Sequence, residues 1–119
     1  MTNNVNIPPK LLVINDMTGV GRCSIAVALP VISCCKVQAC PIPTAVFSNH
    51  LGFASHYSVD LSEHLSEFFA YLNFLPVDFD GVCCGFLNSV GQVANVKTYF
   101  SSLDRSIPIF LVPVMGDHG

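Results

Sequence analysis

The sequence is poor in charged residues. They make up only 11% of its 119 residues, against roughly 25% in a typical soluble domain, whereas apolar residues make up 51%. Too few polar side chains are present to coat a small free-standing domain, which indicates that a partner or further chain covers part of the surface. The net charge is −3, without the excess of lysine and arginine that is typical of nucleic-acid-binding proteins, so we expect no nucleic-acid partner.

Long hydrophobic runs are also missing. The most apolar stretch, residues 24–35, is shorter than the roughly 20 residues of a membrane-spanning helix, and it contains Pro30. The first nine residues are polar and contain proline, without the basic and apolar regions of a secretory signal. We therefore expect no membrane partner and a cytoplasmic location.

The cysteines lack the spacing of a zinc site, since no Cys-x-x-Cys occurs. We interpret them as reduced, small buried hydrophobic residues, with a disulfide scaffold or a reactive thiol as the alternatives. The six are Cys23, Cys34, Cys35, Cys40, Cys83 and Cys84.

Two nucleotide-binding motifs are absent as well. Gly19-Val20-Gly21 resembles the start of a dinucleotide fingerprint, but Ser24 stands where the third glycine belongs. No acidic residue ends the second predicted strand, where Val46 and Phe47 stand. The phosphate-binding pattern G-x-x-x-x-G-K-[ST] does not occur, which excludes a P-loop kinase on this stretch.

What the sequence does contain is a regular alternation of apolar strands and helices. Asp60 or Ser62 is expected to cap the second helix. Pro30 is expected to kink the first helix or to lie near its end. Pro41 and Pro43 are expected to make the second strand irregular or edge-like. The predicted strands are 11–14, 37–47, 80–86 and 107–114, and the predicted helices are 23–35, one from residue 60, and one from Asn88 or Ser89.

This order predicts an α/β fold of three layers, with a mostly parallel sheet between helices. We expect residues 1–119 to form a single partial domain, because the last predicted strand has no helix after it and would leave an apolar sheet edge open.

Polar and aromatic residues follow the predicted strands, at the edge where open α/β sheets bind ligands. The set suits a small polar aromatic ligand with a phosphate donor nearby, although asparagine, aspartate and glycine also serve ordinary turns. His50 either binds a ligand hydroxyl or caps backbone groups of its loop. Asp117 either holds a cation such as Mg²⁺ or forms a turn. His56 and His64 are expected to be exposed to solvent. The segments are Asn15-Asp16 with Gly19 and Gly21, Phe47–His50, Gly85-Phe86 and Met115–Gly119.

At these same segments the sequence resembles the pyridoxal/pyridoxamine kinases of the ribokinase-like superfamily, over their N-terminal portion. The matching stretches occur in the family's order and cover nearly the whole chain. They are INDMTGVGRCS from Ile14 to Ser24, PTAVFSNH from Pro43 to His50, Cys84-Gly85-Phe86, and PVMGD from Pro113 to Asp117.

The resemblance implies ATP-dependent phosphorylation of the 5′-hydroxyl of a B6 vitamer. It places Asp16 against the substituents of the pyridine ring, and Phe47 and Phe86 on either side of the ring as a sandwich. It places His50 and Leu51 beside the substrate, with Leu51 where relatives often carry a polar residue. The complete protein is expected to be a homodimer.

Near the ATP phosphates and Mg²⁺ the resemblance places Val112, where relatives often carry aspartate, and Asp117. It puts the catalytic base and the glycine-rich anion hole in a second half, so no catalytic residue is assigned in this chain, and we expect negligible turnover from it alone. The alternatives are a hydroxymethylpyrimidine or sugar kinase of the same superfamily, and a non-catalytic B6-binding or interaction protein.

Overall fold

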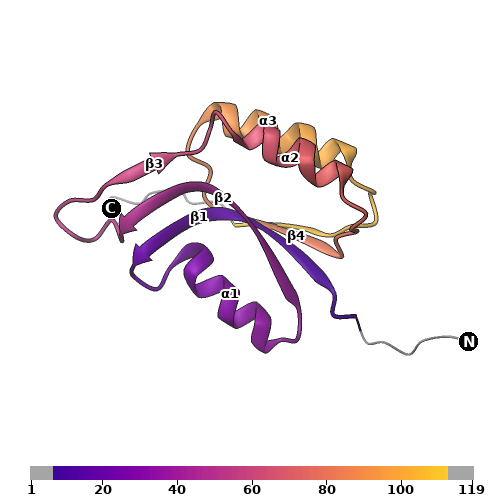
Figure 1. The fold of residues 1–119 in the computed structure, drawn as a ribbon, viewed down its shortest axis with the longest axis horizontal. Coiled ribbons are helices and arrows are strands. Elements are labelled where there is room, and N and C mark those ends of the chain that lie inside the picture. Colours follow the sequence, from indigo (N-terminus) through magenta and orange to yellow (C-terminus); the bar gives the residue numbers. More distant parts are fainter. Residues whose placement is uncertain (1–6, 113–119) are drawn as a thin grey trace, which may run out of the picture.

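The computed structural model describes residues 7–112 of the chain, which form a five-stranded sheet flanked by three helices (Figure 1). The elements in chain order are β1 (Lys10–Val20), α1 (Ser24–Cys34), β2 (Gln38–Asn49), β3 (Ser58–Asp60), α2 (Leu65–Phe74), β4 (Gly81–Cys84), α3 (Val90–Ser102) and β5 (Ile109–Leu111).

The strands lie in the order β3-β2-β1-β4-β5. All neighbouring pairs are parallel except β2 with the short β3, so the predicted mostly parallel sheet is confirmed. The chain leaves β1 through α1 to reach β2 on one side, and later returns to β4 on the other side. The carboxyl end of β1 is therefore the point at which the strand order reverses, where open α/β sheets leave a crevice for a ligand.

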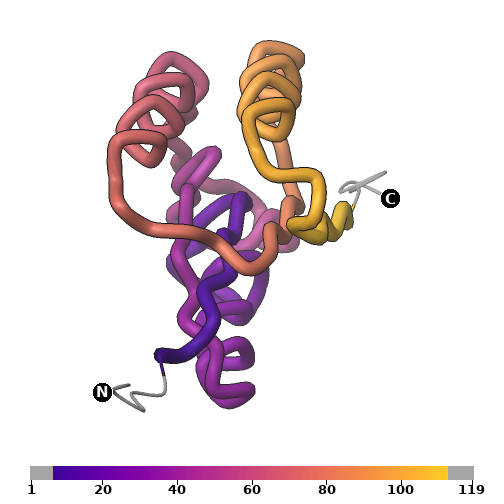
Figure 2. The backbone as a smooth tube through the Cα atoms, turned by 90° about the vertical axis from the view of Figure 1, so that its right-hand side faces the viewer, coloured from indigo at the N-terminus to yellow at the C-terminus, as the bar shows by residue number. Residues whose placement is uncertain are grey.

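The helices lie on both faces of the sheet, as expected for a three-layer α/β fold. Helix α1 covers one face, and α2 and α3 lie together on the other (Figures 1 and 2). Leu12 and Ile14 belong to the main core together with Phe69 and Tyr99, whose rings stack 4.5 Å apart. This core fixes β1 against the helices and so positions the strand end that carries the site.

The second helix begins later than the sequence suggests, and neither Asp60 nor Ser62 caps it. Helix α2 starts at Leu65, and Asp60 ends the antiparallel strand β3, which we did not predict. The Asp60 carboxylate accepts hydrogen bonds from the Ser62 backbone N–H and hydroxyl. Aspartate and serine favour such turns as strongly as they favour helix caps, and here the turn forms.

The prolines of β2 lie where the strand has no outer neighbour. Strand β3 pairs only with residues 45–47, so no described strand pairs with the outer side of Pro41 or Pro43. Pro43 pairs with Asn15 whereas Val46 pairs with Met17, so β2 carries one extra residue at a bulge. The irregular, edge-like strand is thus confirmed over its first half. Pro30 lies inside α1, which ends four residues later at Cys34.

The cysteines only partly follow the prediction of buried hydrophobic residues. All six are free and Cys84 is buried, but Cys34 and Cys35 are exposed at the end of α1. The prediction was wrong for those two because only Ile25 of α1 is buried, near the start of the helix, and Cys34 and Cys35 lie at its other end.

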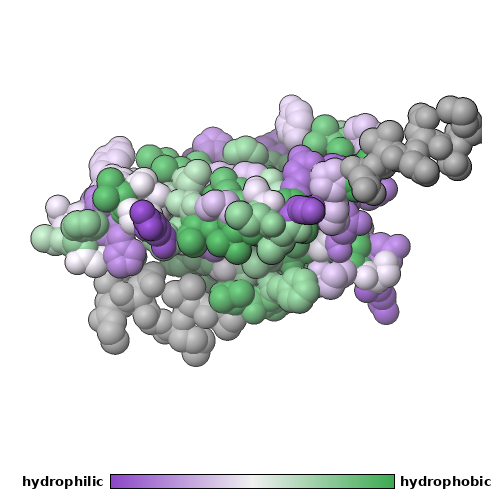
Figure 3. All heavy atoms as spheres, turned by 90° about the horizontal axis from the view of Figure 1, so that it is seen from below, coloured by the Kyte–Doolittle hydropathy of each residue, from purple (hydrophilic) through white to green (hydrophobic). Residues whose placement is uncertain are grey.

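Apolar residues also lie on the surface. The face that carries α1 shows apolar side chains across its middle (Figure 3), and α1 exposes Val27 and Val31. The last strand exposes Phe110 and Leu111. Among residues 7–112, no helix combines the length and the hydrophobicity needed to cross a membrane.

Candidate functional site

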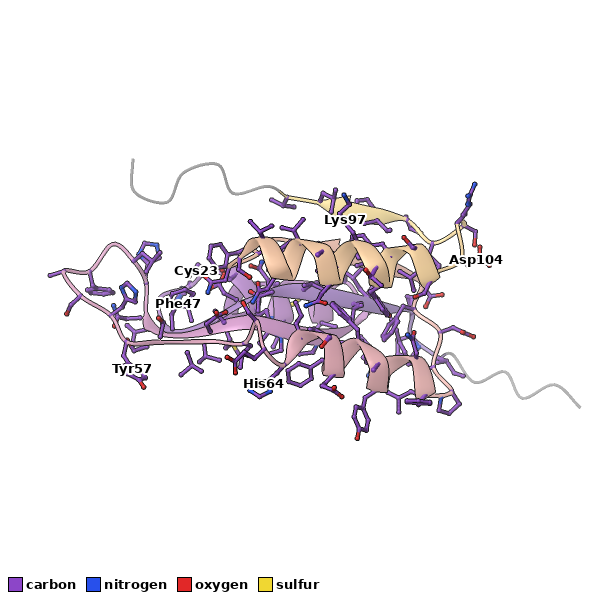
Figure 4. All side chains as sticks on the ribbon, turned by 90° about the horizontal axis from the view of Figure 1, so that it is seen from above. Cys23, Phe47, Tyr57, His64, Lys97 and Asp104 are labelled. Atoms are coloured by element: carbon purple, nitrogen blue, oxygen red, sulfur yellow. The ribbon has the colours of Figure 1, made fainter. Side chains whose placement is uncertain are left out.

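A cavity of about 170 Å³ opens at the carboxyl ends of β1 and β2, beside the loop that follows β4. Figure 4 shows two of its residues, Cys23 and Phe47, at this end of the sheet, away from Asp104 at the other end. The lining residues are Asp16, Thr18, Cys23, Ser24, Phe47, His50, Leu51, Gly52 and Phe86.

All five residues predicted to contact the substrate line this one cavity. They come from β1, β2, the loop after β2 and the loop after β4, segments up to 70 positions apart in the chain, from residue 16 to residue 86. The parallel register of β1 with both neighbours brings the strand ends together. The role of each residue in binding stays a prediction.

Asp16 is a buried carboxylate with a hydroxyl on each oxygen. The Thr18 hydroxyl donates to Oδ2 at 2.8 Å and the Ser24 hydroxyl donates to Oδ1 at 2.6 Å. Ser24 reaches it from the first residue of α1 with a φ of 53°, an uncommon left-handed conformation for serine. Since each carboxylate oxygen can accept two hydrogen bonds, Asp16 keeps acceptor capacity for a donor in the cavity.

Phe47 and Phe86 form an aromatic wall, and their rings are not parallel, as a sandwich around a third ring would require. Their ring centroids are 6.1 Å apart and the rings are inclined at 65°, edge to face. A third ring between two parallel rings needs about 7 Å between their planes, since stacked carbon atoms lie about 3.5 Å apart. The phenylalanines pack edge to face against each other instead, so their role as a sandwich stays a prediction.

The His50 ring is oriented by its own loop. Nδ1 accepts a hydrogen bond from the Gly52 N–H at 2.9 Å, so the neutral ring carries its proton on Nε2 and can donate from there. The His50 backbone N–H donates to the Val20 carbonyl at 2.7 Å, which ties the loop to the end of β1. Both expectations for His50 are therefore compatible with the geometry, because it caps a loop backbone group and also lines the cavity.

His50 packs directly against Gly21, which has no side chain to prevent this contact. Its φ is +127°, and a Cβ atom at this position would lie 2.8 Å from the Cβ of His50. The glycine of the predicted turn is thus required both by its backbone conformation and by the space that His50 occupies.

The other two predicted histidines are exposed, as expected. The His56 ring nevertheless packs edge-on against Phe47, with centroids 5.6 Å apart. Because Phe47 contacts His56 on one side and Phe86 on another, the aromatic wall continues into the β2–β3 loop.

Sequence reasoning missed several residues of the site. Thr18, Cys23 and Ser24 line the cavity, although all three lie within the motif that carries the family resemblance. Their signal was a run of small polar side chains around Gly19 and Gly21, in the last residues of β1 and just after it. Gly52 was missed because glycine in a loop is too common to stand out.

The predicted nucleotide and cation positions are less well defined. The Val112 backbone N–H donates to the Cys84 carbonyl at 2.9 Å, which continues the pairing of β4 with β5, and its side chain is exposed. Asp117 lies outside the described residues. Within residues 7–112, no group of three or more histidine, cysteine or carboxylate side chains is arranged to hold a metal ion.

Comparisons with known proteins give matches only among solved structures. No protein-family model matches the chain. A search of curated proteins gives no match either.

Solved structures of kinases match nearly the whole chain. A Bacteroides thetaiotaomicron protein assigned as a phosphomethylpyrimidine kinase is 33% identical over 96% of this chain, with a TM-score of 0.89. A second crystal form of that protein contains pyridoxal. Pyridoxal kinase from Lactobacillus plantarum is 31% identical over 93% of the chain, with a TM-score of 0.81. Pyridoxal kinase from Leishmania donovani, crystallised with ADP and pyridoxine, shares the fold at 23% identity and a TM-score of 0.77 over 92% of the chain.

The matches cover much less of the kinases than of this chain. The chain spans 40% of the Bacteroides and Lactobacillus proteins and 41% of the Leishmania protein. The predicted α/β architecture and the resemblance to kinases are both confirmed over that length. The chain therefore carries, over about two-fifths of their length, the ribokinase-like fold of the pyridoxal kinases and phosphomethylpyrimidine kinases.

Proposed function

We propose that this chain is the ring-binding part of an ATP-dependent kinase that phosphorylates the 5′-hydroxyl of pyridoxal, pyridoxamine or pyridoxine. The observation that supports it best is the cavity in which Asp16, Phe47, His50, Leu51 and Phe86 meet. A protein 32% identical to this chain was crystallised with pyridoxal, which supports the same ligand class here.

Each side chain has a role that its chemistry allows. The Asp16 carboxylate accepts a hydrogen bond from a polar substituent of the ring, and its own hydroxyl partners keep it oriented. Phe47 and Phe86 cover the apolar surface of the ring. His50 donates from Nε2 to a substrate hydroxyl, and half-buried Leu51 excludes water from that side.

ATP supplies the phosphoryl group, and Mg²⁺ balances its charge. By the family resemblance, Val112 and Asp117 lie near the phosphates and Asp117 near the cation. Proton removal from the substrate hydroxyl and stabilisation of the transferred group belong to residues of the further 60% of the kinase fold. We propose that the complete protein is a cytoplasmic homodimer.

A hydroxymethylpyrimidine kinase is the second candidate, favoured by the similarity to the Bacteroides protein. A pyrimidine ring would fit the same aromatic wall, and its exocyclic amine would donate to Asp16. A sugar has no aromatic face to stack on Phe47 and Phe86, so the aromatic wall favours a pyridine or pyrimidine ring over a sugar. A non-catalytic B6-binding protein would show the same cavity and differ only by lacking phosphate transfer in the complete protein.

The test is calorimetric titration of the 119-residue chain with pyridoxine and with hydroxymethylpyrimidine. Pyridoxine is preferable to pyridoxal because an aldehyde also reacts with lysines such as Lys10, Lys36 and Lys97. We expect saturable binding of pyridoxine, weakened about tenfold by Asp16→Asn and by Phe47→Ala. Asp104→Asn, at the opposite end of the sheet, is the matched control and should leave the affinity unchanged. Absence of pyridoxine binding, or binding that ignores both site variants, would overturn the proposal.

A further inference from the structure

Gln92 is a completely buried polar side chain in the first turn of α3. Its amide Nε2 donates to the backbone carbonyl of Thr44 at 2.8 Å, and its Oε1 accepts from the backbone N–H of Asn88 at 2.6 Å. A buried glutamine held on both its donor and its acceptor side connects β2 directly to the loop that follows β4.

Thr44 continues this connection to the cavity wall. It is also fully buried, and its hydroxyl donates to the backbone carbonyl of Phe86 at 3.0 Å. The Phe86 backbone N–H donates to Asn15 Oδ1 at 3.0 Å. Both backbone polar groups of Phe86 are therefore bonded to side chains, one from β1 and one from β2.

The loop depends on these bonds, because residues 85–88 have no regular secondary structure. Gly85 is bonded to the Ile14 carbonyl, Phe86 to Asn15 and Thr44, and Asn88 to Gln92. Without them, nothing in the strand pairing would determine where the Phe86 ring lies.

We propose that Thr44 and Gln92 are positioning residues that hold the Phe86 ring in place for a bound pyridine ring. The inference rests on the proposed function, because it assigns a role to residues behind the proposed ring site. Neither residue lines the cavity, so an effect on ligand affinity must pass through other residues. The Phe86 backbone, which accepts the Thr44 hydroxyl, is the most direct of these.

A double-mutant cycle tests this directly. Thr44→Val removes the hydroxyl at nearly constant shape and leaves the Phe86 carbonyl without its partner, so we expect pyridoxine affinity to fall about tenfold. Thr44→Ser keeps the hydroxyl and should stay within about twofold of the original. In a Phe86→Ala background, Thr44→Val should cause no further loss, because residues that act through one another are not additive.

Val96→Ala is the control for a purely structural effect. Val96 is a buried core residue of α3, so shortening its side chain weakens the packing of the same helix without removing any hydrogen bond of Thr44, Gln92 or Phe86. We expect this variant to lower the unfolding midpoint but not the pyridoxine affinity. Equal losses of affinity in Val96→Ala and Thr44→Val, or additive losses in the Phe86→Ala background, would refute the positioning role.

The ligand-free state distinguishes failure of this inference from failure of the proposed function. With ¹³C-labelled phenylalanine, the Phe86 ring signals, assigned with Phe86→Leu, should move in Thr44→Val and Gln92→Leu and return in Thr44→Ser. If pyridoxine does not bind but these signals move as expected, the proposed function is wrong and the control of the ring position stands. If the ring signals do not respond, the positioning role is wrong whatever the ligand.

Discussion

The side chain of Asn15 fills the space beside Gly85. A Cβ atom at position 85 would lie 2.7 Å from Cγ of Asn15 and closer still to its Nδ2, distances that real atoms do not reach without a shift. The same asparagine holds the N–H of Phe86 and the N–H of Asp16 on its Oδ1. One side chain thus ties the middle of β1 to the loop that follows β4, beside the cavity.

We predict that Gly85→Ala destabilises the fold by about 1–3 kcal/mol, because the added methyl group must displace Asn15 or the loop. The measurement is urea unfolding followed by circular dichroism. Gly91→Ala is the matched control, since its Cβ would meet only Ser89 Oγ at 3.7 Å and would stand in a helix. That change should be neutral or stabilise by up to about 1 kcal/mol. Equal effects of the two alanines would contradict the prediction.

The thiols should fall into clear reactivity classes. Cys34 and Cys35 are exposed, whereas burial raises the pKa of the Cys84 thiol to about 11. Because the thiolate is the reactive form, we expect Ellman's reagent at pH 8 to modify Cys34 and Cys35 first and Cys84 last. Replacing Cys34 and Cys35 by serine should remove the fast phase, and urea should make all remaining thiols react. A fast phase that survives in the double variant would contradict the assignment.

Stability should also decline at alkaline pH through Cys84. Its folded pKa of about 11 lies above the ordinary value of 9.0, so between these values the unfolded chain loses a proton that the folded chain keeps. The contribution is therefore complete below about pH 9 and is lost as the pH rises toward about 11. Urea unfolding across this range should show a steeper decline for the unaltered protein than for Cys84→Ala. Parallel declines would mean that Cys84 does not contribute.

The 119-residue chain should not transfer phosphate at a useful rate. It spans about 40% of the kinases it matches, and phosphoryl transfer depends on positioned charge around the phosphates as well as on a bound substrate. We expect pyridoxine to bind to the chain. When the chain is incubated with pyridoxine and Mg-ATP, the amount of pyridoxine phosphate measured by chromatography should stay at the level of a control without protein. Turnover at rates of about 1 per second or more, ordinary for kinases, would contradict this.

The sequence predicted the architecture well because the apolar runs around Leu12, Val82 and Tyr99 both reveal the secondary structure and form the core. Their periodicity identifies strands and helices, and the same residues form the core. The strand ends followed from the parallel order, which is why Asp16, Phe47 and Phe86 could be placed at one edge before the structure was known.

Other features depend on contacts that no local pattern reveals. Strand β3 has only three residues, all exposed, so it carries no apolar signal. From the sequence Gln92 looks like a surface residue of α3, yet its side chain is completely buried and bonded to the Thr44 carbonyl of β2. The inclination of Phe86 toward Phe47 depends on the path of the loop, which bonds from distant residues determine.

The reversal of strand order at β1 has a consequence for how such proteins change over time. The crevice lies at that point because two chain paths diverge there, so its place depends on the strand order, whereas its lining depends on side chains. We therefore expect substitutions at lining positions such as Leu51 to change which small ring compound binds while the strand order stays intact.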